Sequence, residues 1–308
     1  MIKNLIFLSL LLIDVQAHAW ARRGHAIIGS AAAYVLEKDF LKEHSFDMSY
    51  YSNVPDFIWK EEEHYTVERV EHFFDKEIFD RTLGADAVYN SNRMEFFTKN
   101  KIPRSAGRAP WRIYELNEDL TRITKDLQDG TKSPKDHQAL QLEWLVRAGT
   151  LGHYVEDLSM PLHVAENYDG VMTGQKGIHG FYEEMIVDEL WPQVEVDVQK
   201  QVKKKWPAFH KNKKSVAVFD LLFQEIKESI LSKDTLLALD KKWGRADLKK
   251  VAPAYKKLLT DNLTLGTLYL AEIWSRQLDW NYDKKNFYLF RGRPEYIPSS
   301  SEPELMKK

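Results

Sequence analysis

The stretch His153-Tyr-Val-Glu-Asp-Leu-Ser-Met-Pro-Leu-His163 decides how this chain is interpreted, because it predicts a helix, its end and a cluster of ligands. His153 and Asp157 are four residues apart, so on a helix their side chains share a face. Pro161 is expected to end or kink the helix and to place His163 as a separate ligand. His179-Gly-Phe-Tyr-Glu183 repeats the four-residue spacing. Imidazole nitrogens and carboxylate oxygens are donors that Zn²⁺ accepts, so these five residues predict a site with more than one metal ion. The plainer alternative is a set of scattered surface polar groups.

Outward from this stretch, most of the chain has helical character. Residues 111–129 place apolar side chains at steps of three and four, as on one face of a helix. Further helices are expected over 21–41, 137–157, 181–202, 215–232 and 253–279. No alternating strand pattern of any length and no internal repeat occurs. The sequence therefore predicts an all-α, single-domain helical bundle over residues 20–289, with metals in a cleft between helices, followed by an irregular tail over 290–308.

The first 19 residues have the features of a secretory signal peptide. Lys3 supplies a positive start, residues 5–13 an apolar core, and Ala17-His-Ala19 a cleavage site. The apolar run is too short to span a membrane, and no later segment approaches the length required. The mature chain is therefore expected to begin at Trp20 and to be secreted or periplasmic.

The composition limits the kinds of metal site and reaction that the chain can support. The chain has no cysteine, although export would permit disulfides, so any metal site must use nitrogen and oxygen donors. The formal charge of −2 supplies no strong global field for steering polyanions. The sequence also lacks a G-x-S-x-G elbow and a P-loop, which leaves serine acyl transfer and nucleoside-triphosphate chemistry without support.

Other segments offer further ligands. The α-amino group of a new N-terminus at Trp20 would join His25 nearby, unless Trp20 merely starts the fold. Asp56 follows a proline, where a helix N-cap is the alternative. His72 lies in an apolar run and would be equally ordinary as a core histidine. Asp75 is either an orienting partner for an imidazole or a plain surface carboxylate.

These motifs in this order resemble the superfamily of zinc-dependent phospholipases C and S1/P1 nucleases. The resemblance covers most of the mature chain and rests on Trp-x4-His25, Pro-Asp56, His72-Phe-Phe-Asp, His153-x3-Asp157-x5-His163 and His179-x3-Glu183. It implies an all-α fold of the phospholipase C/P1 nuclease type that holds three zinc ions.

By the same resemblance, each zinc ion has its own set of ligands. One would be held by Asp56, His72, His153 and Asp157. A second would be held by the Trp20 amino nitrogen and carbonyl with His25 and Asp157, so that Asp157 bridges the pair. The third would be held by His163, His179 and Glu183. Glu184 is the neighbour that a change of one residue in helix phase would exchange with Glu183.

The resemblance implies a hydrolase that attacks phosphodiester bonds with metal-activated water. Bound zinc lowers the pKa of water towards about 7, and a pair of metal ions neutralises the phosphate oxygens. Asp56 is the candidate catalytic residue that orients or deprotonates the water.

The substrate is expected to be either a phospholipid or single-stranded nucleic acid. The short loop between His163 and His179, together with the terminal Glu183, is more similar to the phospholipase C branch than to the nuclease branch. Phe73 and Phe74 would bind substrate in either case, stacking on a base or packing against glycerol, unless they belong to the core. No obligate protein partner is inferred. A secreted zinc-binding protein without catalysis, with closed metal sites, is the alternative from another class.

Overall fold

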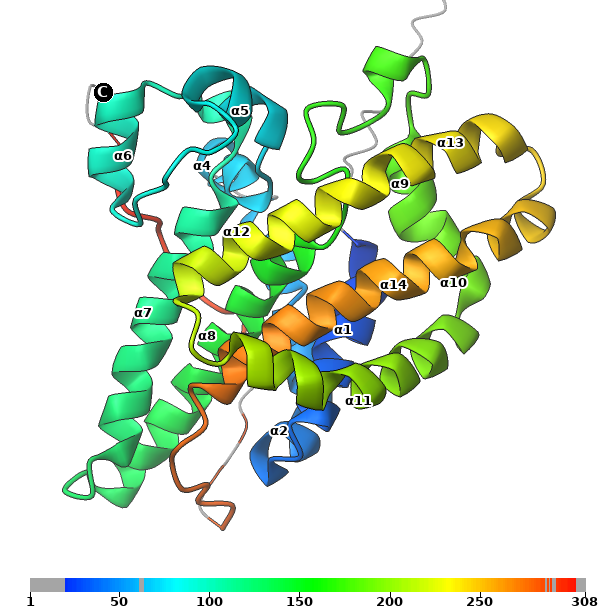
Figure 1. Ribbon diagram of the computed structural model, residues 1–308. Coiled ribbons are helices and arrows are strands. Elements are labelled where there is room, and N and C mark those ends of the chain that lie inside the picture. The colour runs from blue at the N-terminus through cyan, green and yellow to red at the C-terminus, as the bar shows by residue number, and fades with distance from the viewer. Residues whose placement is uncertain (1–19, 61–63, 286, 288, 290–291, 303–308) are drawn as a thin grey trace, which may run out of the picture.

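The computed structural model describes residues 20–60, 64–285, 287, 289 and 292–302. The predicted signal peptide and part of the predicted tail lie outside these residues. The described chain is built almost entirely from helices, which confirms the all-α class (Figure 1). The α-helices are α1 (Ala21–Val35), α2 (Asp39–Glu43), α3 (Ser45–Tyr51), α4 (Tyr65–Glu68), α5 (Lys76–Leu83), α6 (Arg93–Asn100), α7 (Ala109–Gln128), α8 (Pro134–Leu158), α9 (Ile178–Gly180), α10 (Val187–Leu190), α11 (Gln193–Lys213), α12 (Val218–Ser229), α13 (Lys233–Trp243) and α14 (Leu248–Ser275).

Short helices of other types connect them. The 3₁₀ helices are η2 (Arg69–His72), η3 (Arg104–Ala106), η4 (Val171–Thr173) and η6 (Ile230–Ser232). Two π-helices, η1 (Pro55–Trp59) and η5 (Phe181–Ile186), complete the list. Within the described residues, no helix is both long enough and apolar enough to cross a bilayer.

The long helices α8 and α14 form the centre of the core. α8 packs against α3, α7 and α14, while α14 also packs against α1, α11 and α12 (Figure 1). α8 begins where Ser133 accepts a hydrogen bond from Asp136 N and Pro134 occupies the first turn, both favourable at a helix start. Residues 148–158 of α8 are all buried, so the polar groups in this last part must find partners inside the protein.

Two of the predicted helices are interrupted where the backbone cannot continue as a helix. The predictions for 111–129 and 137–157 agree with α7 and α8 to within a few residues. The prediction of one helix over 181–202 is wrong, because Pro192 lacks an N–H and separates α10 from α11. The predicted helix over 21–41 is also divided, since Glu37 adopts a left-handed conformation with φ 54° and the chain restarts as α2.

An irregular segment at residues 72–75 is clamped between two parts of the chain. Phe74 N donates to His163 O at 2.9 Å, and Ala109 N donates to Phe73 O at 3.2 Å. Phe74 and Gly107 form an isolated antiparallel bridge. Gly107 has φ 87°, and a Cβ there would lie 2.0 Å from Phe73 O. Only glycine therefore fits at this crossing.

Gly107→Ala is expected to lower the free energy of unfolding by about 2–4 kcal/mol, because the new methyl group collides with backbone and the positive φ is strained. Urea denaturation followed by circular dichroism measures this loss. Gly84→Ala is the matched control, since Gly84 has φ 92° but nothing within 4 Å of its Cβ position. Equal losses in the two variants would show that strain, rather than the collision, dominates.

The described end of the chain is irregular, as predicted, but it packs tightly on the body. Pro294 O accepts a hydrogen bond from Trp59 Nε1 at 3.3 Å, and Ile297 O accepts one from Arg112 at 2.6 Å. Glu302 is buried and lies 2.9 Å from Arg108 Nε. Residues 292–302 thus form a strap across η1, α6 and α7.

Candidate metal centre

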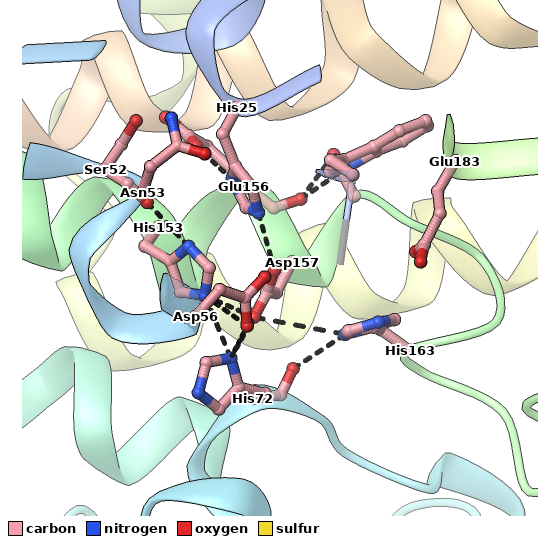
Figure 2. Close-up of polar contacts among 12 residues, drawn as sticks. His25, Ser52, Asn53, Asp56, His72, His153, Glu156, Asp157, His163 and Glu183 are labelled. Carbon is pink, nitrogen blue, oxygen red and sulfur yellow. Dashed lines mark hydrogen bonds and ion pairs between the residues drawn. The ribbon is translucent and has the colours of Figure 1, made fainter. Parts of the chain in front are cut away.

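The predicted ligand side chains come from separate elements and meet in one buried region. They are His25 of α1, Asp56 of η1, His72 of η2, His153 and Asp157 of α8, His163 of the following turn, His179 of α9 and Glu183 of η5. All eight are buried, and Figure 2 shows seven of them, all except His179. Their ligand atoms form three groups that could hold a metal ion: His25, Asp56 and His153; His72, His153 and Asp157; and His163, His179 and Glu183. The proximity predicted from the motifs is therefore present in the fold.

The group around His72 and His153 is tightly packed. His153 Nε2 lies 2.9 Å from His72 Nδ1, and Asp157 Oδ2 lies 3.1 Å from the same His72 atom. Asp56 Oδ1 is 3.5 Å from His72 Nδ1. His153 Nδ1 donates to Ser52 O at 2.7 Å, which assigns the proton of the neutral ring to Nδ1 and leaves a lone pair at Nε2. Burial, together with the neighbouring His25 ring, holds the pKa of His153 well below its ordinary value, so the ring stays neutral.

Asp157 faces two groups with its two oxygens. Oδ2 points to His72 and His153, while Oδ1 lies 3.5 Å from His25 Nε2 (Figure 2). Burial raises the pKa of Asp157 to about 7, although His72 opposes this change. A carboxylate with one oxygen turned to each of two donor groups has the arrangement that a bridging ligand needs.

The group at His163 gives the clearest test of whether a cation fits. His163 Nδ1 donates to His72 O at 2.9 Å and His179 Nδ1 donates to Tyr168 O at 2.7 Å. Their Nε2 atoms face each other at 2.9 Å, and Glu183 Oε2 is 2.8 Å from His179 Nε2. A single proton on His179 would serve only one of these neighbours, whereas a metal ion accepts all three electron pairs. The donor set therefore fits a divalent cation.

Both π-helices carry a predicted ligand. Asp56 lies in η1 and Glu183 in η5, and short π-segments occur frequently at functional sites. In η5, Glu183 is buried beside His179 while Glu184 is exposed. The helix phase therefore selects Glu183, as predicted, and turns Glu184 away.

Trp20 is anchored beside the same end of α8. Its indole Nε1 donates to Glu156 O at 2.8 Å and to Ser159 Oγ at 2.9 Å. Trp20 and Ala21 have φ values of 45° and 38°, a left-handed conformation that costs non-glycine residues about 1–2 kcal/mol each. In the full-length chain the Trp20 nitrogen belongs to a peptide bond, so an amino ligand remains a prediction for the chain that begins at Trp20.

Sequence reasoning missed the carboxylates that orient the imidazoles. Glu156 Oε2 lies 2.5 Å from His25 Nδ1, and Glu68 Oε1 lies 3.5 Å from His72 Nε2. Tyr154 OH also donates to Glu68. Such partners fix the ring orientation and raise the basicity of a ligand. The spacing Glu68-x3-His72 was an available signal, but Glu156 meets His25 only through the packing of α1 on α8.

Glu156→Gln is expected to weaken zinc binding at the His25 group about 10–100-fold, because His25 loses its orienting carboxylate. Competition with a fluorescent zinc chelator measures the change in Kd. Glu143→Gln, on the same helix but away from the cluster, should bind zinc as the unmodified chain does. An unchanged zinc affinity in Glu156→Gln would remove the proposed role of Glu156.

Lys60 is another residue that the motifs did not include. Its ammonium lies 2.9 Å from Asp56 Oδ1, and the side chain is buried. Burial acts to lower the pKa of Lys60, but Asp56, together with Asp157 and Glu183, raises it above its ordinary value. Lys60 is therefore a buried cation at the edge of an otherwise anionic and neutral donor set.

Other predicted residues lie apart from the ligands. Phe74 is fully buried and stacks on Phe79 with ring centroids 4.0 Å apart, so it packs in the core and cannot contact a substrate, contrary to its predicted role. Phe73 is half-buried and stays a candidate. Asp75 precedes α5, and burial raises its pKa to about 8; the orienting role considered for it belongs to Glu68 and Glu156.

Comparison with protein-family models and with curated proteins finds no match to this chain. Its function must therefore be argued from the chemistry of the site.

Proposed function

We propose that the protein is a secreted zinc-dependent phosphodiester hydrolase of the phospholipase C type. The observation that carries the proposal is the convergence of three buried donor groups in which Asp157 faces two of them. A purely structural site needs one closed set of four ligands. Two adjacent groups that share His153, with Asp157 facing both, instead match the paired-metal arrangement that phosphodiester hydrolysis uses.

The chain offers a ligand set for each of three ions. His72, His153, Asp56 and Asp157 would hold one ion, and His25 and Asp157 with the mature N-terminus a second. His163, His179 and Glu183 would hold the third. When bound, zinc would supply an activated water near neutral pH and would neutralise charge on the phosphate.

The protein's own side chains would contribute positioning and proton transfer. Asp56 Oδ1 lies within 3.7 Å of His153 Nε2 and 2.9 Å of Lys60 Nζ, so it is placed to accept a proton from a nucleophile at the cluster. Lys60 is paired with Asp56 and would supply a positive charge beside an anionic phosphodiester. Buried electrostatic contacts of this kind act more strongly than exposed ones.

Phospholipid is the substrate class that we propose. The loop that leads to His179 exposes apolar side chains rather than a row of cations, whereas nucleic-acid binding relies on contacts between cations and phosphates.

The test is a parallel assay of the chain beginning at Trp20, loaded with zinc, on phosphatidylcholine, single-stranded DNA and RNA. We expect release of phosphocholine and no cleavage of nucleic acid. Cleavage of nucleic acid without lipid hydrolysis would replace the proposed substrate. No hydrolysis of any substrate, at full zinc content, would favour a non-catalytic zinc-binding protein.

One added glycine before Trp20 is expected to abolish activity, because it moves the free amino group away from the place that the proposal gives it among the ligands of the second ion. Zinc content, measured by atomic emission, should fall by one ion per chain while circular dichroism stays unchanged. A conservative Lys3→Arg change in the signal peptide is the control, since it leaves the mature chain identical. Full activity of the extended chain would exclude the amino ligand.

A further inference from the structure

The loop between His163 and His179 exposes an unusual set of apolar side chains. Tyr168, Val171 and Met172 are 52%, 59% and 67% exposed. They lie within five consecutive positions, around the short helix η4. In Figure 1 this green segment, which leads into α9, extends past the helices that surround it. Grouped apolar exposure of this kind marks a surface that contacts another phase or molecule.

The loop is held in a defined shape. Asn167 Oδ1 accepts from Met172 N at 2.9 Å, and Asn167 Nδ2 donates to Thr173 Oγ1 at 3.1 Å. Gln175 N donates to Gly170 O at 2.8 Å. Gly170 has φ 71°, and a Cβ there would lie 2.7 Å from Gln175 O. The apolar side chains are therefore presented by an ordered turn.

The same loop is bonded to the third ligand group. Asp169 Oδ1 accepts from Gly177 N at 2.9 Å and from His179 N at 3.2 Å. Tyr168 O accepts from His179 Nδ1 at 2.7 Å. Because these bonds join the loop directly to a ligand imidazole, whatever contacts Val171 and Met172 is held next to the metal centre.

The end of α13 adds an aromatic side chain and cations. Arg245 donates to Gln175 O at 2.7 Å and to Lys176 O at 2.9 Å, which ties the loop to this end. Trp243 there is 47% exposed, and Lys242 Nζ lies 5.2 Å from its ring centroid. Tryptophan and lysine beside aliphatic side chains suit the boundary between lipid headgroups and acyl chains.

We propose that the tip of the 164–177 loop inserts Val171 and Met172 into a phospholipid bilayer and so brings headgroup phosphodiesters to the metal centre. The inference rests on the proposed phospholipase function. A bilayer fits better than a protein partner, because the tip is a small projection whose apolar side chains point into solvent. Insertion to about 5–10 Å is the depth at which interfacial segments act.

The experiment uses the zinc-loaded chain beginning at Trp20 and a double variant, Val171→Ser with Met172→Ser. Binding to phosphatidylcholine vesicles is measured by sedimentation. Hydrolysis is measured on the same vesicles and on a short-chain phosphatidylcholine kept below its critical micelle concentration. We expect the double variant to bind vesicles at least tenfold more weakly and to hydrolyse them more slowly, while kcat/KM on the soluble lipid stays unchanged.

Phe46→Ser is the matched control, because Phe46 is 69% exposed and is the second residue of α3. α3 follows α2, which lies at the opposite end of the molecule from the loop (Figure 1). It should behave as the unmodified chain in both assays. Equal vesicle binding by the double variant, or an equal loss in Phe46→Ser, would overturn the inference. Vesicle binding that needs Val171 and Met172, without hydrolysis of either lipid, would support the membrane-binding role of the loop and refute the proposed activity. Cleavage of DNA with no vesicle binding would refute both.

Discussion

Asp157→Asn is expected to release two of the three proposed zinc ions together and to lower kcat/KM by about 10³-fold or more. The reason is that Oδ2 of Asp157 serves the His72 and His153 group while Oδ1 faces His25. An amide replaces one of these acceptor oxygens by a donor and removes the negative charge that both cations would share. Zinc content by atomic emission and hydrolysis of the soluble phospholipid measure the two effects.

Two further variants separate the bridging role from a general loss of structure. Glu183→Gln should release only the third ion, because Glu183 contacts His179 and belongs to a single group. Glu184→Gln should keep all three, since its side chain is exposed. Release of a single ion by Asp157→Asn would show that Asp157 serves one group only.

Glu302→Ala is expected to lower the free energy of unfolding by about 3–5 kcal/mol, the usual cost of removing one partner from a buried ion pair. Glu302 lies 2.9 Å from Arg108, 3.3 Å from Arg104 and 3.4 Å from Arg93. Arg93 retains Glu71 at 2.7 Å. The buried Arg108 guanidinium would keep its hydrogen bonds to backbone carbonyls and its contact with the Phe97 ring at 3.6 Å, but it would lose the carboxylate at 2.9 Å. Urea denaturation monitored by tryptophan fluorescence measures the loss.

Glu295→Ala provides the control for this change, because Glu295 lies in the same strap and is exposed. Its free energy of unfolding should stay within about 0.5 kcal/mol of the unmodified chain. A similarly small effect for Glu302→Ala would mean that the arginines are adequately solvated without it. A large effect would establish the strap as part of the folded domain.

The clustering of the donor residues could be predicted from sequence, whereas not all of the residues that support them could. Four-residue spacing on a helix is a local property. It therefore allows two pairs to be recognised in the sequence, His153 with Asp157 and His179 with Glu183. Lys60 has the same four-residue spacing from Asp56, so the signal was present but was not used. Glu156 gave no such signal, because it matters through its contact with His25, far away in sequence.

The helix boundaries also differ in how well the sequence predicts them. The apolar periodicity of 111–129 predicted α7 well, because its buried face repeats along one element. The failures fall at Glu37 and Pro192, where one residue changes the backbone path without disturbing the hydrophobic pattern. The packing of residues 292–302 could not be predicted, since its many prolines and serines form no periodic face and its docking depends on arginines from α6 and α7.

The hydrogen bonds between residues 72–74 and His163 affect how successive zinc ions would bind to the proposed centre. His163 Nδ1 donates to His72 O, and Phe74 N donates to His163 O, each at 2.9 Å. The His163 ring is therefore bonded to the backbone of a residue from another donor group, and the backbone of residue 163 is bonded to the same segment. Ordering His163 restricts the segment that carries His72, and such linkage makes each binding event favour the next. A zinc titration of the apoprotein should accordingly rise more steeply than that of independent sites, with partly filled molecules scarce at every concentration.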